Sequence, residues 1–306
     1  MEPTTHGTHA ERPGGTRAGD AIRRTPTSSH SGRRSAPRMC RRAWLALALL
    51  PFTAACTASS DEEVAMGKAD AAKVESELPI VHDTVVERFV NTLGRSIASR
   101  TSRADLDWHF AVVNTPEVNA FALPGGFIYV DRGLIERADR LDQLAGVMGH
   151  EVGHVVRRHS VQQMKESQRH LLGLVLLCTL TRVCSSVGGR VAVDVGSDAL
   201  TARYSQRDEA QADSEGVRNS VRAGIDPEGL PSFFQKLLDE QKEQPSAVEA
   251  FFSTHPTDQS RIDATQQQIG ALDPGQLRGL VRDTPEFHAV QERIRALPAE
   301  PPAPTP

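Results

Sequence analysis

Two histidines spaced four residues apart flank a glutamate in the segment His150-Glu151-Val152-Gly153-His154. On an α-helix such residues lie on one face, so both imidazoles can contact a single ion, and imidazole is a good ligand for Zn²⁺. Glu151 lies about 100° around the helix from His150, where it can take a proton from the attacking water. The pattern also occurs by chance in unrelated helices, but small and apolar neighbours at 145–149 and 155–156 favour a buried active-site helix.

A catalytic zinc ion needs a third protein ligand and an open position for water. Glu209 and Asp213 are again four residues apart on a predicted helix, so one can bind the metal while the other hydrogen-bonds a ligand histidine. An ordinary acidic helix face is the alternative explanation of this pair. The candidates downstream of the histidine motif are Asp194, Asp198, Asp208, Glu209, Asp213 and His255.

Short strands and longer helices must hold these residues in place. Residues 108–113, 119–123 and 127–130 have the composition of strands, and Pro124-Gly125-Gly126 is a turn sequence. Apolar residues spaced three and four apart predict helices over about 78–94, 132–152, 208–223, 230–241, 258–272 and 285–297. The sequence therefore predicts one domain over 78–297, mainly α with a small antiparallel β-sheet (α+β).

The first 77 residues read as export and attachment signals. Residues 1–38 are rich in Gly, Pro, Ser, Thr and Arg and predict a disordered leader, or a gene start placed too early. Residues 39–55 combine two arginines with about ten apolar residues and a small-residue exit, which is typical of a secretory signal peptide. A short buried helix or an uncleaved anchor is the alternative. Residues 56–77 predict a polar tether, and residues 298–306 predict a Pro-rich disordered tail.

The exit sequence Thr53-Ala54-Ala55-Cys56 resembles a bacterial lipoprotein box, in which Cys56 is lipidated and becomes the new N-terminus. Thr53 departs from that pattern, where leucine is usual. Thr57 follows instead of aspartate, which by resemblance to lipoprotein sorting favours the outer membrane. We therefore expect a protein of the bacterial cell envelope, held by a lipid anchor and facing the periplasm. Cys178 and Cys184 could pair in that oxidising compartment or remain free thiols.

The charge distribution excludes one class of partner. The net charge is −4, and the basic surplus is confined to the first 42 residues. The acidic remainder argues against nucleic-acid binding, which needs clustered Lys and Arg. No apolar run approaches the ~20 residues of a spanning helix, which argues against a polytopic membrane protein. The apolar run 171–178 predicts a buried helix or a mobile flap that touches membrane or unfolded substrate.

Taken together, five ordered motifs resemble a known family. Residues 149–154 followed by 209–213 resemble the HExxH…ExxxD pattern of HtpX-type and CAAX prenyl protease-type zinc metallopeptidases. Residues 119–130 are similar to that family's NAFxxPGG strand motif, and Arg207 precedes the glutamate as it does in the family. Residues 253–256, followed by Arg261, are similar to its C-terminal HP…R motif. The resemblance spans about 78–295.

The resemblance implies a gluzincin-type metallopeptidase fold with one Zn²⁺ per chain, held by His150, His154 and Glu209. It implies that Asp213 orients a ligand histidine by a hydrogen bond. Glu151 is then the general base and later the proton donor.

Other histidines have less defined roles. His255 is similar to a histidine that approaches the zinc in some secreted members, where it is a reversible latch or stabilises the oxyanion. A structural histidine before a helix is the alternative. His159 is expected on another face of the helix, at the surface, and His82 and His109 have no partner pattern.

Because it lacks multiple spanning helices, the chain resembles the periplasmic, lipoprotein-like branch of the family. We expect an endopeptidase that cleaves unfolded or misassembled envelope proteins. The substrate is expected to add a strand by backbone hydrogen bonds along Gly126, Phe127, Ile128, Tyr129 and Val130. A chaperone-like or latched binding protein with a closed zinc site is the rival function. Processing of a prenylated substrate is disfavoured without an intramembrane chamber.

Overall fold

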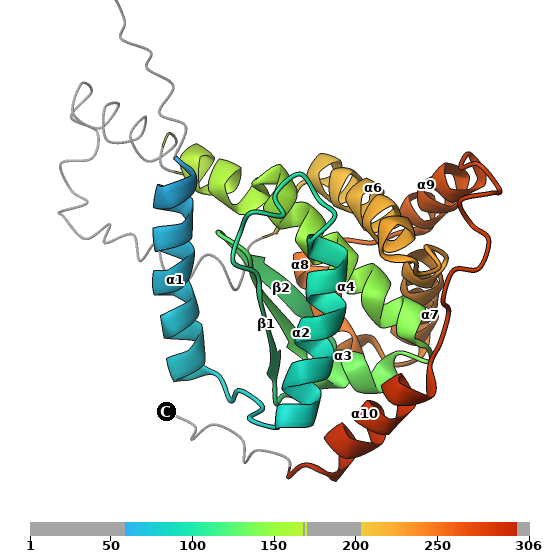
Figure 1. Cartoon of the computed structure of the whole chain (residues 1–306), viewed down its shortest axis with the longest axis horizontal. Coiled ribbons are helices and arrows are strands. Elements are labelled where there is room, and N and C mark those ends of the chain that lie inside the picture. The colour runs from blue at the N-terminus through green and yellow to red at the C-terminus, as the bar shows by residue number, and fades with distance from the viewer. Residues whose placement is uncertain (1–58, 168, 170–202, 299–306) are drawn as a thin grey trace, which may run out of the picture. The chain divides into compact units, whose positions relative to one another are not determined.

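The structure is a computed structural model, and it describes residues 59–167, 169 and 203–298 (Figure 1). The described chain is mostly helical, with one three-stranded sheet within these residues, which confirms the predicted α+β class. Predictions that fall outside the described residues concern the leader 1–38, the signal peptide 39–55, the lipidation site Cys56, the apolar run 171–178, the tail beyond Pro298, and Cys178, Cys184, Asp194 and Asp198.

The three predicted strands form one sheet, but its pairing is mixed. Strands β1 (His109–Val113), β2 (Ala120–Leu123) and β3 (Phe127–Asp131) lie in the order β1-β3-β2. β2 and β3 form an antiparallel hairpin, and the φ angles of Gly125 and Gly126 in its turn are 79° and 103°, values that favour glycine. β1 pairs with β3 in parallel, so the prediction of an antiparallel sheet is wrong for that pair. Strand composition does not specify which strand lies in the middle.

Side chains of the sheet alternate between two apolar clusters, one on each face. One face, which includes Phe110 and Ile128, joins the main core together with helices α2 (Thr84–Ala98) and α4 (Leu141–Arg157). The opposite face, which includes Phe121, belongs to a smaller cluster beneath helix α1 (Ser60–Glu77). The sheet is therefore buried on both sides, with α4 on the face of the main core.

Helix α1 (Ser60–Glu77) occupies the segment whose composition predicts a polar tether, so that prediction is wrong for residues 60–77. The helix docks on the sheet through small residues, which is why its apolar content is low. A Cβ atom added to Gly67 would overlap the carbonyl oxygen of Pro124, so the close approach requires glycine there. Its buried residues are Glu63, Gly67, Ala71 and Val74.

The other predicted helices are confirmed with shifted ends, and the helix predicted over 132–152 is divided at 138–140. Helix α4 has its most extensive interface with α6 (Gln206–Ala223), and both run beside each other in Figure 1. Glycine permits this approach, because a Cβ on Gly153 would lie 2.9 Å from the carbonyl oxygen of Ala212. The remaining elements are α3 (Arg132–Arg137), α6 (Gln206–Ala223), α7 (Gly229–Glu243), the 3-10 helix η2 (Pro245–Ala247), α8 (Glu249–Thr254), α9 (Gln259–Gly270) and α10 (Pro285–Ala296).

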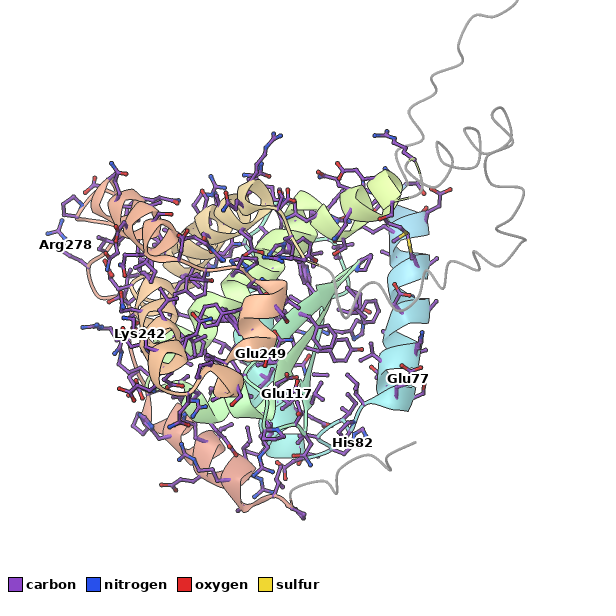
Figure 2. All side chains as sticks on the ribbon, turned by 180° about the vertical axis from the view of Figure 1, so that it is seen from behind. Glu77, His82, Glu117, Lys242, Glu249 and Arg278 are labelled. Atoms are coloured by element: carbon purple, nitrogen blue, oxygen red, sulfur yellow. The ribbon has the colours of Figure 1, made fainter. Side chains whose placement is uncertain are left out.

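Most exposed large side chains of the described residues are polar, with Val85 and Val281 as the apolar exceptions. Acidic and basic side chains such as Glu117, Lys242 and Arg278 project from the ribbon (Figure 2). Among the described residues, no helix is both long enough and apolar enough to span a membrane.

Candidate metal centre

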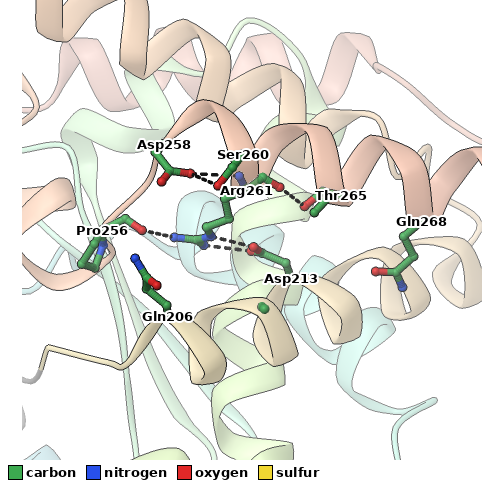
Figure 3. Close-up of a pocket in the computed structure, with 10 residues that line it drawn as sticks. Gln206, Asp213, Pro256, Asp258, Ser260, Arg261, Thr265 and Gln268 are labelled. Atoms are coloured by element: carbon green, nitrogen blue, oxygen red, sulfur yellow. Dashed lines mark hydrogen bonds and ion pairs between the residues drawn. The ribbon is translucent and has the colours of Figure 1, made fainter.

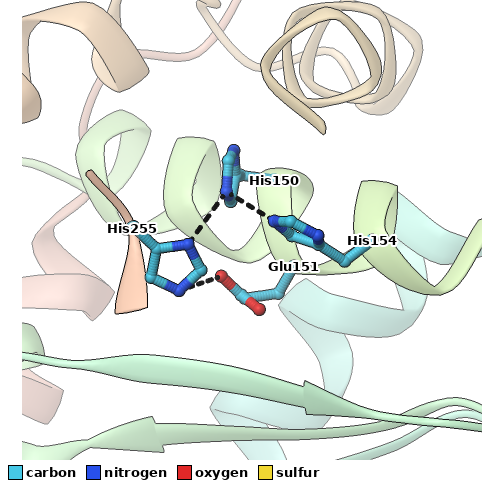
Figure 4. A group of neighbouring side chains, drawn as sticks. All are labelled: His150, Glu151, His154 and His255. Carbon is cyan, nitrogen blue, oxygen red and sulfur yellow. Dashed lines mark hydrogen bonds and ion pairs between the residues drawn. The ribbon is translucent and has the colours of Figure 1, made fainter. Parts of the chain in front are cut away.

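Helix α4 carries the histidine motif into the interior of the protein. All its residues from Leu141 to Val155 are buried. His150 and His154 project from one face, and their Nε2 atoms lie 3.0 Å apart (Figure 4). Their relative exposures are 1% and 0%, so solvent does not reach either ring. The helical spacing of the two histidines thus has the predicted consequence.

Helix α6 supplies a carboxylate that holds the first of these rings. Asp213 Oδ1 lies 2.8 Å from Nδ1 of His150. A carboxylate accepts hydrogen bonds, so Nδ1 of His150 donates and its Nε2 carries the free lone pair. Burial raises the pKa of Asp213, but hydrogen bonds from Arg261 and His150 outweigh burial and lower it, so the carboxylate is ionised.

Glu209, one helical turn before Asp213, faces both ring nitrogens. Its Oε2 lies 3.6 Å from Nε2 of His150, and its Oε1 lies 3.4 Å from Nε2 of His154. Burial raises the pKa of Glu209, but the neighbouring histidines outweigh burial and hold it well below its usual range. Two helices therefore bring two imidazoles and one ionised carboxylate to a single point.

Glu151 stands beside this point with a different environment. One ligand atom each from His150, Glu151, His154 and His255 lie within 4.8 Å of one another. Neither carboxylate oxygen of Glu151 accepts a hydrogen bond from any described residue, and the nearest ring nitrogen, Nε2 of His255, is 3.4 Å from its Oε1. Burial raises the pKa of this carboxyl group. A buried carboxyl group with raised pKa and no donors suits a proton acceptor.

His255 follows the short helix α8 and reaches the same cluster from the opposite side. Its Nδ1 lies 3.2 Å from Oε1 of Glu209 and 3.4 Å from Nε2 of His150. Its Nε2 lies 3.3 Å from the carbonyl oxygen of Ala120 on strand β2. Burial lowers the pKa of His255, but the carboxylates of Glu209 and Glu151 outweigh burial and raise it to about 9. His255 thus lies between the metal-ligand candidates and the edge of the sheet.

These donors fit a divalent transition metal. Imidazole nitrogens and carboxylate oxygens are the donor set that zinc takes in catalytic sites. The two Nε2 atoms face each other at 3.0 Å with Oε1 of Glu209 beside them, and the carboxylate oxygens of Glu151 lack donors among the described residues. A cation at this point would compensate the buried carboxylates and the facing lone pairs.

A model of the family described as "Peptidase family M48" matches residues 85–269, more than half of the chain. The chain belongs to this family. Residues 85–269 therefore form a domain of a peptidase family. The likeness to HtpX-type or CAAX prenyl protease-type members in particular stays a prediction.

Individual relatives agree with this membership. The chain is 30% identical over 229 residues to the beta-barrel assembly-enhancing protease of Yersinia pestis, covering 72% of this chain and 47% of that protein. It is 28% identical over 251 residues to the protein of that name from Escherichia coli K12, covering 79% and 50%. It is 28% identical over 192 residues to the mitochondrial metalloendopeptidase OMA1 of Schizosaccharomyces pombe, covering 63% and 55%. The chain spans about half the length of these relatives.

His159 also lies at the centre, although its helical spacing from His154 predicts a position at the surface. His159 is 2% exposed, and its Nδ1 lies 3.0 Å from Nδ1 of His154, so the prediction of a surface histidine is wrong. Helix α4 ends at Arg157, and Arg158 adopts the left-handed conformation with a φ of 60°. The angular phase of α4 is lost at that residue, so a helical wheel cannot place His159. His82, by contrast, projects from the surface (Figure 2), and His109 stacks on Phe127 outside the centre.

The sequence patterns did not place two more residues, Tyr204 and Arg261, at the centre. The ring of Tyr204 stacks on His154 with centroids 3.9 Å apart, and its hydroxyl lies 2.9 Å from Oγ of Ser160. Arg261, recognised only as part of a motif, lines a pocket between α6 and α9 and holds Asp213 through two hydrogen bonds (Figure 3). No spacing rule links either residue to the histidines, because each comes from a separate segment.

The expected substrate strand lies in the wrong place for strand addition. β3 is the middle strand, paired with β1 on one side and β2 on the other, so residues 127–130 have no free edge. Strand β2 is an edge strand of this sheet, and Ala120 at its start contacts His255. The β2 edge, rather than β3, therefore adjoins the M48 metal centre.

Proposed function

We propose that this M48 peptidase is a zinc-dependent endopeptidase in which His150, His154 and Glu209 hold the metal. The observation that carries the proposal is the approach of both carboxylate oxygens of Glu209 to the two facing Nε2 atoms, at 3.4 and 3.6 Å. When bound there, Zn²⁺ supplies a Lewis acid that polarises the scissile carbonyl and acidifies the attacking water.

The side chains beside the zinc ligands supply the proton transfers. Glu151 accepts the proton of the attacking water at a carboxylate oxygen and passes it to the leaving amine. Its burial and lack of hydrogen-bond donors within the described chain support this role. Asp213 keeps Nδ1 of His150 protonated and its Nε2 free, at a distance of 2.8 Å. His255 lies where it can donate from Nε2 to an oxyanion that develops beside Glu151.

We propose that the substrate binds as an extended strand along the edge of β2 that pairs with no other strand of the described residues. Backbone hydrogen bonds to an edge strand read little side-chain information, which suits unfolded or misassembled chains that expose strands. Residues Gly126 to Val130 then stabilise β2, the strand that binds substrate, because β3 pairs with β2 on its other side. The names of the bacterial relatives and the export pattern of residues 39–55 support envelope proteins as the substrate class.

We also propose that lipidated Cys56 anchors the protein to the outer membrane on its periplasmic side. The three residues between Cys56 and the start of α1 would then hold the peptidase close to the lipid surface. Mass spectrometry of the mature N-terminus tests this point: a diacylated or triacylated Cys56 is expected. An unmodified N-terminus, or unchanged membrane association of Cys56→Ala, would contradict it.

Cleavage of unfolded casein by the metal-loaded protein tests the function. Glu151→Gln should retain zinc and reduce cleavage by about 10²–10⁴-fold, because it removes only the proton acceptor. Glu209→Gln should lose both zinc and cleavage. Glu77→Gln, an exposed glutamate at the end of α1, is the matched control and should cleave like wild type. Full cleavage activity of Glu151→Gln would contradict the role of Glu151 as the proton acceptor.

A latched binding protein with a closed zinc site is a second candidate. The observation in its favour is the position of Nδ1 of His255, 3.4 Å from Nε2 of His150, where it can complete a four-ligand site. His255→Ala separates the two functions. Cleavage by His255→Ala but not by wild type indicates a latched peptidase. Absence of cleavage by both, with zinc bound, indicates a binding protein.

A further inference from the structure

On the side away from His150, the ring of His154 contacts His159, which in turn contacts Gln211. Nδ1 of His154 lies 3.0 Å from Nδ1 of His159, and Nε2 of His159 lies 3.2 Å from Oε1 of Gln211 on α6. His154 and His159 are buried at 0% and 2% exposure. Within the described residues, Nδ1 of His154 therefore faces another imidazole and has no carboxylate partner of the kind that Asp213 provides for His150.

Two imidazole nitrogens in contact must differ in protonation, since one donates and the other accepts. Oε1 of Gln211 is an acceptor, so Nε2 of His159 carries the proton. Nδ1 of His159 is then the acceptor, and Nδ1 of His154 donates to it. This leaves Nε2 of His154 with its lone pair directed at His150 and Glu209.

The opposite order of donors and acceptors in the hydrogen bonds between His154, His159 and Gln211 would be incompatible with metal binding. A proton on Nδ1 of His159 would force Nδ1 of His154 to accept, and the proton of His154 would then sit on Nε2. It would also direct the Nε2 lone pair of His159 at Oε1 of Gln211. Two further groups lie near His159. Oδ1 of Asp208, also on α6, lies 3.7 Å from its Nε2, and the ring centroids of Tyr204 and His159 are 6.1 Å apart. The carboxylate of Asp208, like Oε1 of Gln211, favours a proton on Nε2 of His159.

We propose that His159 is a positioning residue that keeps His154 in the tautomer able to bind metal, with Gln211 setting the order of donors and acceptors. The inference rests on the proposed role of His154 as a zinc ligand. It assigns a function to the histidine five residues beyond the motif and to a glutamine on α6. Partners that fix the tautomer of a ligand histidine typically contribute 10–100-fold to metal affinity or activity.

Two substitutions of equal size distinguish this role from packing. In His159→Asn, the amide oxygen replaces Nδ1 as an acceptor, whereas His159→Leu has the same shape without an acceptor. The zinc dissociation constant is measured by competition with a chromogenic chelator, alongside kcat and KM for casein. His159→Leu should bind zinc about 10–100-fold more weakly than wild type, and His159→Asn should recover most of that loss. When His154→Ala is also present, the His159→Asn and His159→Leu proteins should have equal zinc dissociation constants.

The outcomes separate the inference from the function on which it rests. If wild type binds no zinc and cleaves nothing, the proposed function fails and takes this inference with it. If wild type binds zinc but His159→Leu binds equally well, only the inference fails. It also fails if His159→Asn and His159→Leu are weakened alike, since that result indicates packing.

A milder pair covers the case in which His159→Leu does not fold, which thermal melting without metal would reveal. Gln211 is only partly buried, and its substitution acts one step further from the metal. Gln211→Glu keeps an acceptor towards Nε2 of His159, so its zinc affinity should stay within about threefold of wild type, whereas Gln211→Leu should fall below it. Equal affinities of these two variants would overturn the inference.

Discussion

Arg261 binds Asp213 through two hydrogen bonds, 2.6 Å from Nε to Oδ2 and 2.8 Å from Nη2 to Oδ1. Its third nitrogen, Nη1, lies 2.6 Å from Oε2 of Glu209. One planar guanidinium therefore orients both the carboxylate that holds His150 and the carboxylate expected to bind zinc. A rigid fork with several donors can do this, whereas a lysine ammonium is a single point charge.

Arg261→Lys should therefore weaken zinc binding and reduce kcat/KM by about 10–100-fold, although the charge is kept. Arg293→Lys is the matched control, because Arg293 makes the same two-bond contact with Asp83 at the surface, at 2.7 Å for each bond. The control should leave zinc affinity and cleavage unchanged. Equal behaviour of the two variants in the chelator competition would show that the geometry of the guanidinium is unimportant.

Glu63 should be essential for the docking of α1. Its side chain is 1% exposed and lies 2.6 Å from Nη1 of Arg103 and 2.7 Å from Nε of Arg158, while the backbone N–H of Gly125 donates to it at 3.3 Å. Glu63→Gln leaves two arginines with a buried neutral partner, so the free energy of unfolding should fall by about 3–5 kcal/mol. Urea unfolding measures the loss.

The exposed glutamate at the other end of the same helix is its control. Glu77→Gln should change the unfolding free energy by less than about 0.5 kcal/mol. If Glu63→Gln unfolds at the same urea concentration as Glu77→Gln, the buried cluster does not hold α1 in place.

Gly146 should not tolerate a side chain. An added Cβ would lie 2.7 Å from the backbone nitrogen of Leu230 and 2.8 Å from its Cα, so α4 and α7 would have to separate. Gly146→Ala should cost about 1–3 kcal/mol and displace the histidine helix, lowering kcat/KM as well. Gly270→Ala, at a helical glycine with open space around it, should be neutral or stabilising by up to ~1 kcal/mol. Thermal melting and casein cleavage of both variants check the contrast.

Asp131 should make the protein less stable as the pH rises. Burial, helped by the negative charge of Glu117, raises the pKa of Asp131 to about 8, against about 3.9 in an unfolded chain. The folded state therefore binds this proton more tightly. Its stabilising effect is complete below about pH 4 and is lost as the pH rises through 8.

Asp131→Asn should therefore raise the free energy of unfolding relative to wild type, with little gain at pH 4 and a gain that grows with pH to at least about 1 kcal/mol at pH 9. Asp83→Asn is a control of opposite sign, because Arg293 lowers the pKa of Asp83 to about 2 and the wild-type carboxylate is stabilising at neutral pH. A difference between Asp131→Asn and wild type that does not depend on pH would show that the carboxyl group is not perturbed.

The sequence by itself determined the features that depend on local geometry. The 3.6-residue period brings His150 and His154 together and places Glu209 and Asp213 one turn apart, whatever the helices pack against. The turn glycines and the apolar periods likewise predicted the strands and most helices, because φ preferences and amphipathic spacing act over a few residues.

Tertiary structure alone decided the relationships between segments. It put β3 between β1 and β2 and made β1 and β2 the edge strands of the sheet in the described residues, because strand composition does not choose partners. It turned a polar segment into the docked helix α1, because small residues pack closely without an apolar signature. It brought His159 behind His154, because the left-handed Arg158 breaks the helical phase. Contacts between residues distant in the chain depend on the packing of whole elements, which no local pattern specifies.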